Sequence, residues 1–290
     1  MPTRAMVTSP HRPNRDRRRR TVRQQQVLEL LRARARHDFG SYKRSTRRRR
    51  IHRRMGLRNI GTLNDYLEEL RANPDEVRTL VADLMISVTG FFRDVEAWNA
   101  LTASVIDPLV AARDSGAAIR IWVPACATGE EAYSIAMLVT EQAEAARKRF
   151  DLKVFATDAQ ENNLRKARDG VYPAAATADF PPERLQRFFE KLDGSFQVRK
   201  ELRDMVVFAQ QNLLCDPPFS RLDLISCRNC LIYLEPEAQQ RIVALCHFGL
   251  RQGGHLFLGN AETVGRHGDL SRPCPRNGGS IAGKARPGTT

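Results

Sequence analysis

The chain has 290 residues, of which 42% are hydrophobic and 28% are charged, which is enough to build one large domain or two modest ones. This composition excludes a chain that is disordered throughout. No apolar run approaches the roughly 18 to 20 residues of a membrane span, and the arginine-rich start lacks the apolar stretch of a signal peptide. We therefore expect a cytoplasmic protein without membrane insertion. The six cysteines are too few and too scattered for a disulfide scaffold.

The net charge of +14 is concentrated in the amino-terminal part of the chain. Residues 1–54 hold 19 basic and three acidic side chains, a balance of +16, whereas the remaining 236 residues are almost neutral at −2. The excess includes two blocks of four arginines, at residues 17–20 and 47–50. Such a segment favours an acidic partner, which could be a nucleic acid or an acidic protein.

The first 88 residues carry a helical pattern after a polar start. Residues 1–21 combine three prolines and the first arginine block with almost nothing apolar, which predicts a disordered basic lead-in. From residue 22 the apolar side chains recur at helical spacing, for example at Leu63, Tyr66, Leu67 and Leu70. Residues 22–88 are therefore expected to form a small, basic, all-helical domain.

From about residue 118, short apolar runs alternate with helical segments. The predicted strands cover residues 118–124, 152–157, 204–209, 222–227 and 255–258, and the clearest helices cover residues 130–148 and 236–251. This alternation is typical of an α/β fold with a mostly parallel sheet, in which ligands bind beyond the carboxyl ends of the strands. The polar end of the chain, residues 271–290, shows no strand pattern, so we expect a disordered tail there and no closing strand.

The loop after the first predicted strand reads V-P-A-C-A-T-G-E-E over residues 123–131. It has one glycine where the dinucleotide-binding pattern G-x-G-x-x-G has three, and Glu130 and Glu131 would repel a pyrophosphate. A ligand with a positive centre and no phosphate suits the loop better, and S-adenosylmethionine is such a ligand. Alternatively, Thr128 and Glu131 could form a capping box at the start of the helix.

Polar side chains also follow the other predicted strands. Asp158 ends the second strand, where carboxylates hold ribose hydroxyls in cofactor-binding sheets, although it could instead cap the next helix. Asn212 follows the third strand, and Arg228 and Asn229 end the apolar fourth strand. Such a switch from apolar to polar residues usually marks a site.

Cys227 and Cys230 have the C-x-x-C spacing that can indicate zinc binding or redox chemistry. No second pair stands at ligand spacing, and Cys246 and His247 fall inside the next predicted helix. We therefore expect no metal site.

Five segments, in order, resemble the motifs of CheR-type chemotaxis receptor methyltransferases over residues 24–265. They are I-S-V-T-G-F-F-R-D at 86–94, I-W-V-P-A-C-A-T-G-E-E-A-Y-S-I-A at 121–136, A-T-D at 156–158 with A-R-D-G-V-Y at 167–172, N-L at 212–213, and C-R-N-C-L-I-Y at 227–233. The segment D-F-G-S-Y-K-R-S-T at 38–46 is similar to versions in hybrids that join a methylesterase to the methyltransferase. The resemblance implies a Rossmann-like S-adenosylmethionine-dependent methyltransferase sheet preceded by a small all-helical domain.

The same resemblance implies that the chain methylates glutamate side chains of chemoreceptors, with S-adenosylmethionine as donor, and so acts in chemotaxis adaptation. Its partners would be the cytoplasmic domains of methyl-accepting receptors, and we expect a monomer. Residues 22–88 would recognise the substrate, and residues 89–270 would bind the cofactor and catalyse the transfer. Ser87 replaces an asparagine found in some relatives. We see no insertion after the fourth strand for the small β subdomain that some relatives use to tether receptor tails.

Individual roles carry over by position. Arg93 and Tyr233 would stand nearest the transferred methyl group and act in catalysis. The cofactor would be lined by Ser87, Thr89, Arg93, Glu130 or Glu131, Asp158, Asn212, Leu213, Asn229 and Cys230. The receptor would be bound by Lys43, Arg44, Arg47, Arg50 and Arg54, of which residues 43, 47, 50 and 54 fall on one helix face.

Two other functions remain open from the sequence. The basic segment could belong to a nucleic-acid-binding protein or an RNA methyltransferase. However, Phe39 and Tyr42 are the only aromatic residues among its basic side chains, and proteins that bind single strands use several aromatic rings to stack on the bases. The chain could also be a regulatory module that binds S-adenosylmethionine or a receptor without turnover. The presence of four residues argues against that last alternative: Arg93, Asp158, Asn229 and Tyr233.

Overall fold

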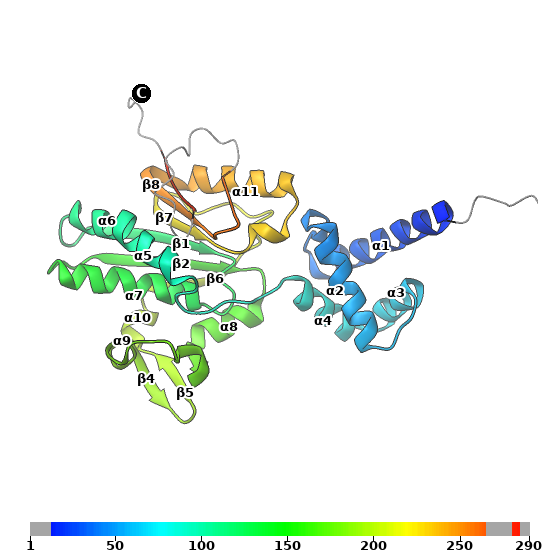
Figure 1. Cartoon of the computed structure of the whole chain (residues 1–290), viewed down its shortest axis with the longest axis horizontal. Helices are drawn as coiled ribbons and strands as arrows, with labels where there is room; N and C mark the ends of the chain where they lie inside the picture. Colours follow the sequence, from blue (N-terminus) through cyan, green and yellow to red (C-terminus); the bar gives the residue numbers. More distant parts are fainter. Residues whose placement is uncertain (1–12, 265–279, 285–290) are drawn as a thin grey trace, which may run out of the picture. The chain divides into compact units, whose positions relative to one another are not determined.

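The structure is a computed structural model, and it describes residues 13–264 and 280–284. The chain divides into two compact units, Met1–Ile86 and Ser87–Thr290, which Figure 1 shows in blue to cyan and in cyan to red. The sequence predicts a boundary after residue 88, and the division lies two residues earlier. Among the described residues, no helix is both long enough and apolar enough to span a membrane.

The described part of the first unit contains the helices α1 (Pro13–Ala35), α2 (Arg44–Leu57), α3 (Leu63–Ala72) and α4 (Pro74–Leu84). The sequence predicts disorder as far as residue 21, but α1 begins at Pro13. Proline suits the first helical position, and the arginines and glutamines that follow are good helix formers. Residues 1–12 of that prediction lie outside the described residues.

The four helices share one apolar core. Its largest fully buried side chains include Leu31, Phe39, Tyr66, Leu67 and Leu80. The starts of α3 and α4 are fixed by side-chain caps at Thr62 and Asn73, whose oxygens accept backbone N–H groups of the first helical turn. The apolar residues that recur at helical spacing in the sequence are therefore the ones that the helices bury in this core.

A buried carboxylate joins α2 to α4 within this core. Glu76 is 3% exposed and accepts hydrogen bonds from Arg54 Nε at 3.0 Å and Nη2 at 2.6 Å, and from the Tyr66 hydroxyl at 2.8 Å. Burial by itself would raise the pKa of Glu76, but the hydrogen bonds from Arg54 and Tyr66 outweigh it and hold the pKa below its ordinary value. Arg54 therefore stabilises the helical unit from inside.

The Arg54→Ala variant should lower the free energy of unfolding of the helical unit by about 3 to 5 kcal/mol, because it leaves the buried Glu76 carboxylate without its cation. Arg53→Ala is the matched control, since the Arg53 side chain is 55% exposed in its ion pair with Asp83 and such pairs contribute about 0 to 1 kcal/mol. Urea unfolding followed by circular dichroism measures both changes. Equal losses in the two variants would contradict this account of Glu76.

The second unit is built around one mostly parallel sheet, as predicted (Figure 1). Its strands are β1 (Ala118–Pro124), β2 (Asp151–Asp158), β6 (Val206–Gln210), β7 (Leu222–Cys227), β8 (Leu250–Leu258) and β9 (Ser280–Gly283), in the order β6-β2-β1-β7-β8-β9. Strands β1, β2, β6, β7 and β8 run parallel, and β9 is antiparallel to β8. The strand order reverses between β1 and β7.

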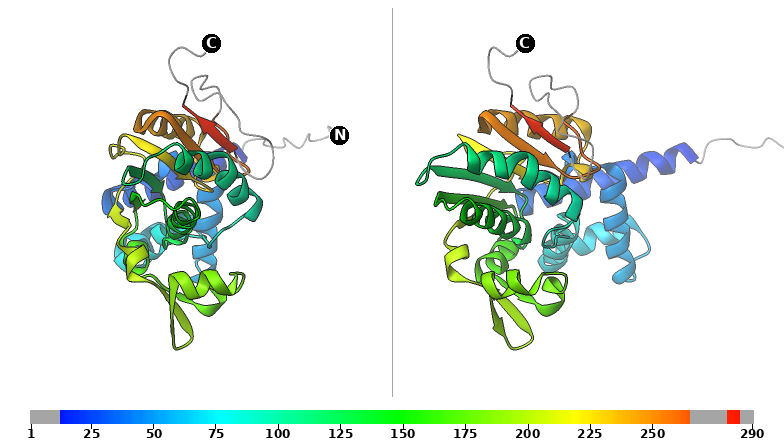
Figure 2. Two further views of the ribbon diagram at one scale, coloured as in Figure 1. Left: turned by 90° about the vertical axis from the view of Figure 1, so that its left-hand side faces the viewer. Right: turned by 60° about the vertical axis from the view of Figure 1, so that its left-hand side comes forward.

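Helices cover both faces of this sheet. The described helices of the second unit are α5 (Val95–Leu101), α6 (Asp107–Ala111), α7 (Glu130–Ala145), α8 (Glu161–Asp169), α9 (Pro182–Phe188), α10 (Lys200–Arg203) and α11 (Pro236–Gly249). One core unites α5, α6 and α7 with alternate residues of the central strands, among them Ile121, Val123 and Leu224. Figure 2 shows α11 on the opposite side of the sheet.

The structure contains one element of this unit that the sequence analysis did not predict. It is a small antiparallel sheet in the order β3-β5-β4, made of β3 (Val171–Pro173), β4 (Phe189–Leu192) and β5 (Ser195–Val198). It lies between α8 and α10 in the chain, and no strand is inserted in the described residues between β7 and β8, as expected. Strands of three or four residues carry too short an alternation to be recognised in the sequence.

The structure corrects the expectation for the carboxyl-terminal segment, for which the sequence predicts disorder. Residues 280–283 form β9 and close the sheet against β8, with Leu258 opposite Ser280 and His255 opposite Gly283. Ile281 and Ala282 are buried there. So short an apolar pair has no visible pattern of its own and becomes a strand only because β8 offers an unpaired edge. Residues 265–279 and 285–290 of that prediction lie outside the described residues.

Candidate functional site

The carboxyl ends of β1, β2, β6 and β7 bring the predicted site segments to one edge of the sheet. Ligands of open α/β sheets bind at this edge, where the strand order reverses. The loop after β1 turns sharply here, with positive φ angles at Ala125, Ala127 and Gly129. A Cβ atom on Gly129 would lie 2.9 Å from Ala167 Cβ, so the single glycine of the loop is required by close packing.

Asp158, at the end of β2, holds that loop in shape. Its Oδ2 accepts the Ala127 N–H at 3.0 Å, and its Oδ1 accepts the Gln160 N–H at 2.8 Å and Asn163 Nδ2 at 3.3 Å. Burial raises the pKa of Asp158. Oδ2 retains one acceptor position for a ligand hydroxyl. The alternative that Asp158 is the N-cap residue of the next helix is wrong, because α8 begins at Glu161 and its N-cap residue is Gln160.

Ser87 lies beside Asp158, although the two are far apart in sequence. The Ser87 hydroxyl oxygen accepts hydrogen bonds from Gln160 Nε2 at 3.0 Å and from Asn163 Nδ2 at 2.8 Å. Asn163 thus links Ser87 to the Asp158 carboxylate. Sequence reasoning missed Asn163, whose one signal is a polar amide one turn into the helix after Asp158. Thr89, two residues after Ser87, is half-buried.

The end of β6 meets the end of β2 through a backbone hydrogen bond of 3.1 Å from Gln211 N to the Asp158 carbonyl. This places Asn212 and Leu213, both half-buried, at the same edge. The Asn212 side chain accepts the Leu214 N–H at 3.1 Å, and its backbone N–H donates to Asp216 at 2.7 Å. The amide oxygen of Asn212 is therefore engaged in shaping its own turn.

Glu130 and Glu131 begin α7, and the structure gives them different neighbours. The Thr128 hydroxyl lies 2.7 and 2.9 Å from the Glu130 carboxylate oxygens, and the Ser226 hydroxyl donates to Glu131 at 2.7 Å. The alternative of a capping box between Thr128 and Glu131 is therefore wrong. Burial raises the pKa of Glu130 and raises that of Glu131 to about 7, against the opposing effects of Arg228 and Ser226 on Glu131.

The segment before α5 carries Arg93 on a strained turn. Phe92 and Asp94, on either side of it, both have positive φ angles. The Arg93 side chain is exposed, and its backbone carbonyl accepts hydrogen bonds from Trp98 Nε1 at 2.8 Å and Arg228 Nη1 at 3.1 Å. Arg93 is thereby joined to the end of β7.

The segment after β7 holds the remaining predicted residues. Asn229 has a φ of 58°, Cys230 is half-buried, and the Tyr233 ring is half-buried at the end of a short 3₁₀ helix. Glu262, missed in the sequence, organises this segment. Its buried carboxylate accepts the N–H groups of Asn229, Leu231, Ile232 and Gly259 at 2.7 to 3.3 Å. The only feature of the sequence that could have indicated Glu262 is its position as a single acidic residue just after an apolar strand.

The Cys227 and Cys230 sulfur atoms lie 3.2 Å apart, and both residues are free cysteines. Within residues 13–264 and 280–284, no group of three or more His, Cys, Asp or Glu side chains could hold a metal ion. The tight turn between β7 and the following 3₁₀ helix brings these two sulfur atoms together.

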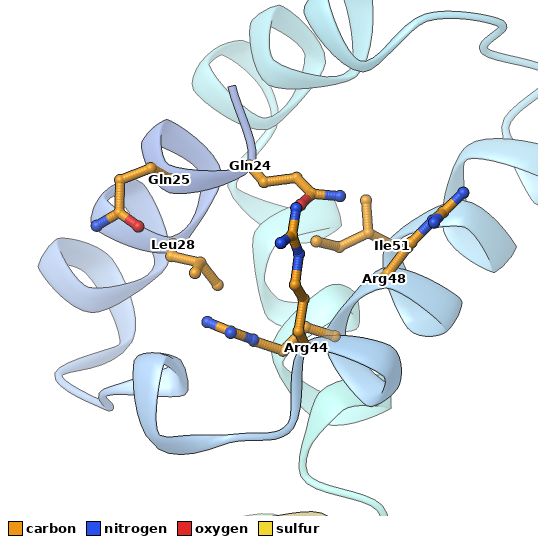
Figure 3. Close-up of a pocket in the computed structure, with 7 residues that line it drawn as sticks. Gln24, Gln25, Leu28, Arg44, Arg48 and Ile51 are labelled. Carbon is orange, nitrogen blue, oxygen red and sulfur yellow. The ribbon is translucent and has the colours of Figure 1, made fainter. Parts of the chain in front are cut away.

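In the helical unit, the predicted receptor-binding residues do not all share one environment. Lys43 is the N-cap residue of α2 and is half-buried. A hollow of about 190 Å³ is lined by Gln24, Gln25, Leu28, Arg44, Arg47, Arg48 and Ile51 (Figure 3). Arg50 is half-buried, with a buried Nε that has no hydrogen-bond partner among the described residues. Arg54 is 14% exposed and bound to Glu76, so it does not belong to this basic surface.

The residues at the sheet edge fit S-adenosylmethionine. Its positive sulfonium and ammonium groups suit a site with the buried Glu130 and the half-buried Glu131 at the start of α7, because burial makes ionisation of a carboxyl group costly and a bound cation offsets that cost. Asp158 keeps an acceptor position for a ribose hydroxyl. No lysine or arginine lies in the loop of residues 124–129, where a phosphate-binding cofactor would be expected to need compensating charge.

Fold and site together define an S-adenosylmethionine-dependent methyltransferase. Residues 87–277 match the family model described as CheR methyltransferase, SAM binding domain, and residues 24–85 match the model described as CheR methyltransferase, all-alpha domain. The chain therefore belongs to the CheR family of protein-glutamate O-methyltransferases.

Individual relatives agree with the family models. The chain is 32% identical over 234 residues to "Chemotaxis protein methyltransferase 2" of Vibrio cholerae, covering 79% of this chain and 81% of the relative. It is 32% identical over 232 residues to "Chemotaxis protein methyltransferase 1" of Pseudomonas aeruginosa, covering 78% and 84%. It is 44% identical over 238 residues to an uncharacterized 104.1 kDa protein of Rhodobacter capsulatus, covering 82% of this chain and a quarter of that longer relative.

Asp158→Ala should weaken the binding of S-adenosylmethionine by about 1 to 3 kcal/mol, because it removes hydrogen bonds to a charged acceptor and loosens the loop held through Ala127. Asp151→Ala is the matched control, since Asp151 is exposed at the opposite end of the same strand and should not change binding. Calorimetry on folded protein measures both affinities. Unchanged affinity in Asp158→Ala, or binding of NAD in place of S-adenosylmethionine, would contradict the assignment.

The affinity for S-adenosylmethionine should rise as the pH increases through about 7, the pKa of Glu131. Burial raises this pKa above that of the unfolded chain, so the folded protein favours the protonated carboxyl at lower pH, and a bound cation then has to displace that proton. Between pH 8 and pH 6 we expect roughly tenfold weaker binding. Glu131→Gln should flatten the profile, whereas Glu141→Gln, on the same helix, should retain it. A profile that is equally steep in Glu131→Gln would rule out this group.

Proposed function

We propose that this chain transfers the methyl group of S-adenosylmethionine to glutamate side chains of chemoreceptors, and so sets receptor methylation in chemotaxis adaptation. The observation that carries the proposal is the match of both CheR family models, in order, to a chain whose sheet edge gathers Asp158, Glu131 and Arg93. Relatives named chemotaxis protein methyltransferase support the same substrate class.

This reaction does not require general acid–base catalysis by the protein. When bound, S-adenosylmethionine supplies a methyl group activated by its positive sulfur. A glutamate side chain has an ordinary pKa near 4.3, so the acceptor carboxylate is already ionised at neutral pH and needs no general base. Holding the acceptor in line with the transferred group can supply about 7 to 11 kcal/mol of the rate enhancement.

In this proposal, Arg93 and Tyr233 act on the acceptor. The Arg93 guanidinium is exposed and can hold a carboxylate through two N–H groups. The Tyr233 hydroxyl makes no hydrogen bond to any described residue and can donate one to the same carboxylate. The cofactor would be lined by Ser87, Thr89, Arg93, Glu130, Glu131, Asp158, Asn212, Leu213, Asn229 and Cys230.

We further propose that the enzyme works in the cytoplasm as a monomer and without a metal ion. The receptor domains that carry methylated glutamates lie on the cytoplasmic side, and the acceptor carboxylate is ionised without the help of a Lewis acid.

The direct test is incubation with S-adenosylmethionine labelled in the methyl group and with cytoplasmic fragments of chemoreceptors. We expect label in the receptor fragments that mild base releases as methanol, because glutamate methyl esters hydrolyse in base. Fragments in which the accepting glutamates are replaced by alanine serve as the control. Base-stable label, or label that persists in those fragments, would overturn the assignment of glutamate as acceptor.

Receptor recognition is assigned to the basic surface formed by Lys43, Arg44, Arg47 and Arg50. Reversing these charges to glutamate should reduce methylation of receptor fragments by at least tenfold and leave S-adenosylmethionine binding within twofold, because the cofactor residues lie in the other unit. Receptor titrations and calorimetry measure the two effects. A loss of cofactor affinity together with activity would indicate misfolding instead of lost recognition.

The nucleic-acid alternative gains no support from the family models or from the relatives. Competition with non-specific RNA separates the two interpretations. At physiological salt, RNA should inhibit receptor methylation only weakly, since a helix face with few phosphate contacts loses affinity steeply as salt rises. Tight RNA binding at that salt, with label appearing in RNA and none in receptor, would favour the alternative.

A further inference from the structure

Arg228, at the end of β7, carries a guanidinium group that is 0% exposed. Its Nη2 donates to the Asp94 carboxylate at 2.9 Å, and its Nη1 donates to the Arg93 carbonyl at 3.1 Å. The same Nη1 lies 3.8 Å from the Glu131 carboxylate. The guanidinium carbon lies 4.7 Å from the Phe257 ring centre and 5.3 Å from that of Trp98. Arg228 thus contacts both the Arg93 turn and the cofactor-binding helix.

The needs of this buried charge are met through the turn that carries residues 93 and 94. A buried guanidinium is retained when its donors are paired and its positive charge is neutralised. Asp94 neutralises the charge at 2.9 Å, and the Nη1 donor is paired with the backbone carbonyl of Arg93. The Nε atom has no partner among the described residues. The guanidinium is therefore oriented toward residues 93 and 94 at the cost of one unpaired donor.

The turn that Arg228 holds is one that the local sequence does not favour. Phe92 and Asp94 have φ angles of 46° and 63°, a region that residues other than glycine rarely adopt. Such a conformation persists only where its surroundings fix it. Here the Arg93 carbonyl accepts hydrogen bonds from Arg228 and from the Trp98 indole, and Arg228 also binds the Asp94 side chain. These bonds hold the backbone of the turn from which the Arg93 side chain projects.

We propose that Arg228 is a positioning residue that aims the Arg93 side chain at the acceptor carboxylate and joins its turn to Glu131 of the cofactor-binding helix. This inference rests on the proposed function, in which Arg93 binds the acceptor. Arg228 has no exposed surface of its own with which to touch a substrate. Its effect on the reaction therefore passes through Arg93.

The test is a double-mutant cycle of Arg228→Lys with Arg93→Ala, read as kcat and KM for receptor methylation and as the affinity for S-adenosylmethionine. A lysine keeps the charge but cannot span both the Arg93 carbonyl and the Asp94 carboxylate. We expect Arg228→Lys to lower kcat at least tenfold in the unaltered chain and less than threefold in the Arg93→Ala background. Binding of S-adenosylmethionine should stay within threefold.

The matched control is Arg113→Lys. Arg113 also donates to one backbone carbonyl, that of Ala118, and to one buried carboxylate, that of Asp223, at the opposite end of β7. It should change kcat less than threefold, and by the same factor with and without Arg93. Equal factors for Arg228→Lys in the two backgrounds would show that Arg228 acts only through general stability and would overturn the proposal.

Amide hydrogen exchange gives a measurement that needs no substrate. In Arg228→Lys, amides of residues 91–98 should exchange at least tenfold faster, while those of β1 and β2 stay unchanged. In Arg113→Lys, residues 91–98 should exchange at the normal rate. If the unaltered chain methylates no receptor, the proposed function fails, and the exchange data still decide whether Arg228 holds the turn. Unchanged exchange at residues 91–98 would overturn that assignment, whatever the activity.

Discussion

The parallel pairing of β1 with both β2 and β7 is the constraint on which the site depends. The register places Pro124 opposite Thr157 and aligns Ile121 with Leu224, so the segments that follow these strands leave the sheet at the same edge. Because the strand order reverses between β1 and β7, the loops on either side separate and leave room for a ligand. Of the cofactor residues proposed from the sequence, Asp158 ends β2, Glu130 and Glu131 follow the loop after β1, and Asn229 and Cys230 follow β7.

Buried charges then give that edge its precise shape. Asp158 fixes the loop after β1, Glu262 fixes the segment after β7, and Arg228 fixes the turn that carries Arg93. All three groups are buried; Asp158 and Glu262 are satisfied mainly by backbone N–H groups, and Arg228 by the Asp94 carboxylate and the Arg93 carbonyl. A charged hydrogen bond in a dry environment is strong and directional, so it can impose backbone conformations that the local sequence disfavours.

The arginines of the helical unit show that one residue type serves two purposes. Arg54 points inward and neutralises Glu76, whereas Arg44 and Arg47 line an open hollow about two to three turns earlier on the same helix. Spacing alone puts residues 43, 47, 50 and 54 on one face. The partner of each guanidinium, and not its spacing, separates the arginines that stabilise the unit from those proposed to meet a receptor.

The sequence by itself determined the α/β class, the strands around residues 118–124 and 222–227, the helical unit and the family, because these rest on long periodic runs and on motifs in order. Only the tertiary structure decided the small sheet, the closing strand β9, the partners of Glu131 and the roles of Arg54, Arg228 and Glu262. Short strands have too few residues to show a period, and they form when a neighbouring edge supplies hydrogen bonds. A charged residue looks the same in sequence whether solvent or a buried carboxylate surrounds it, since its partner can stand 22 residues away, as Glu76 does from Arg54.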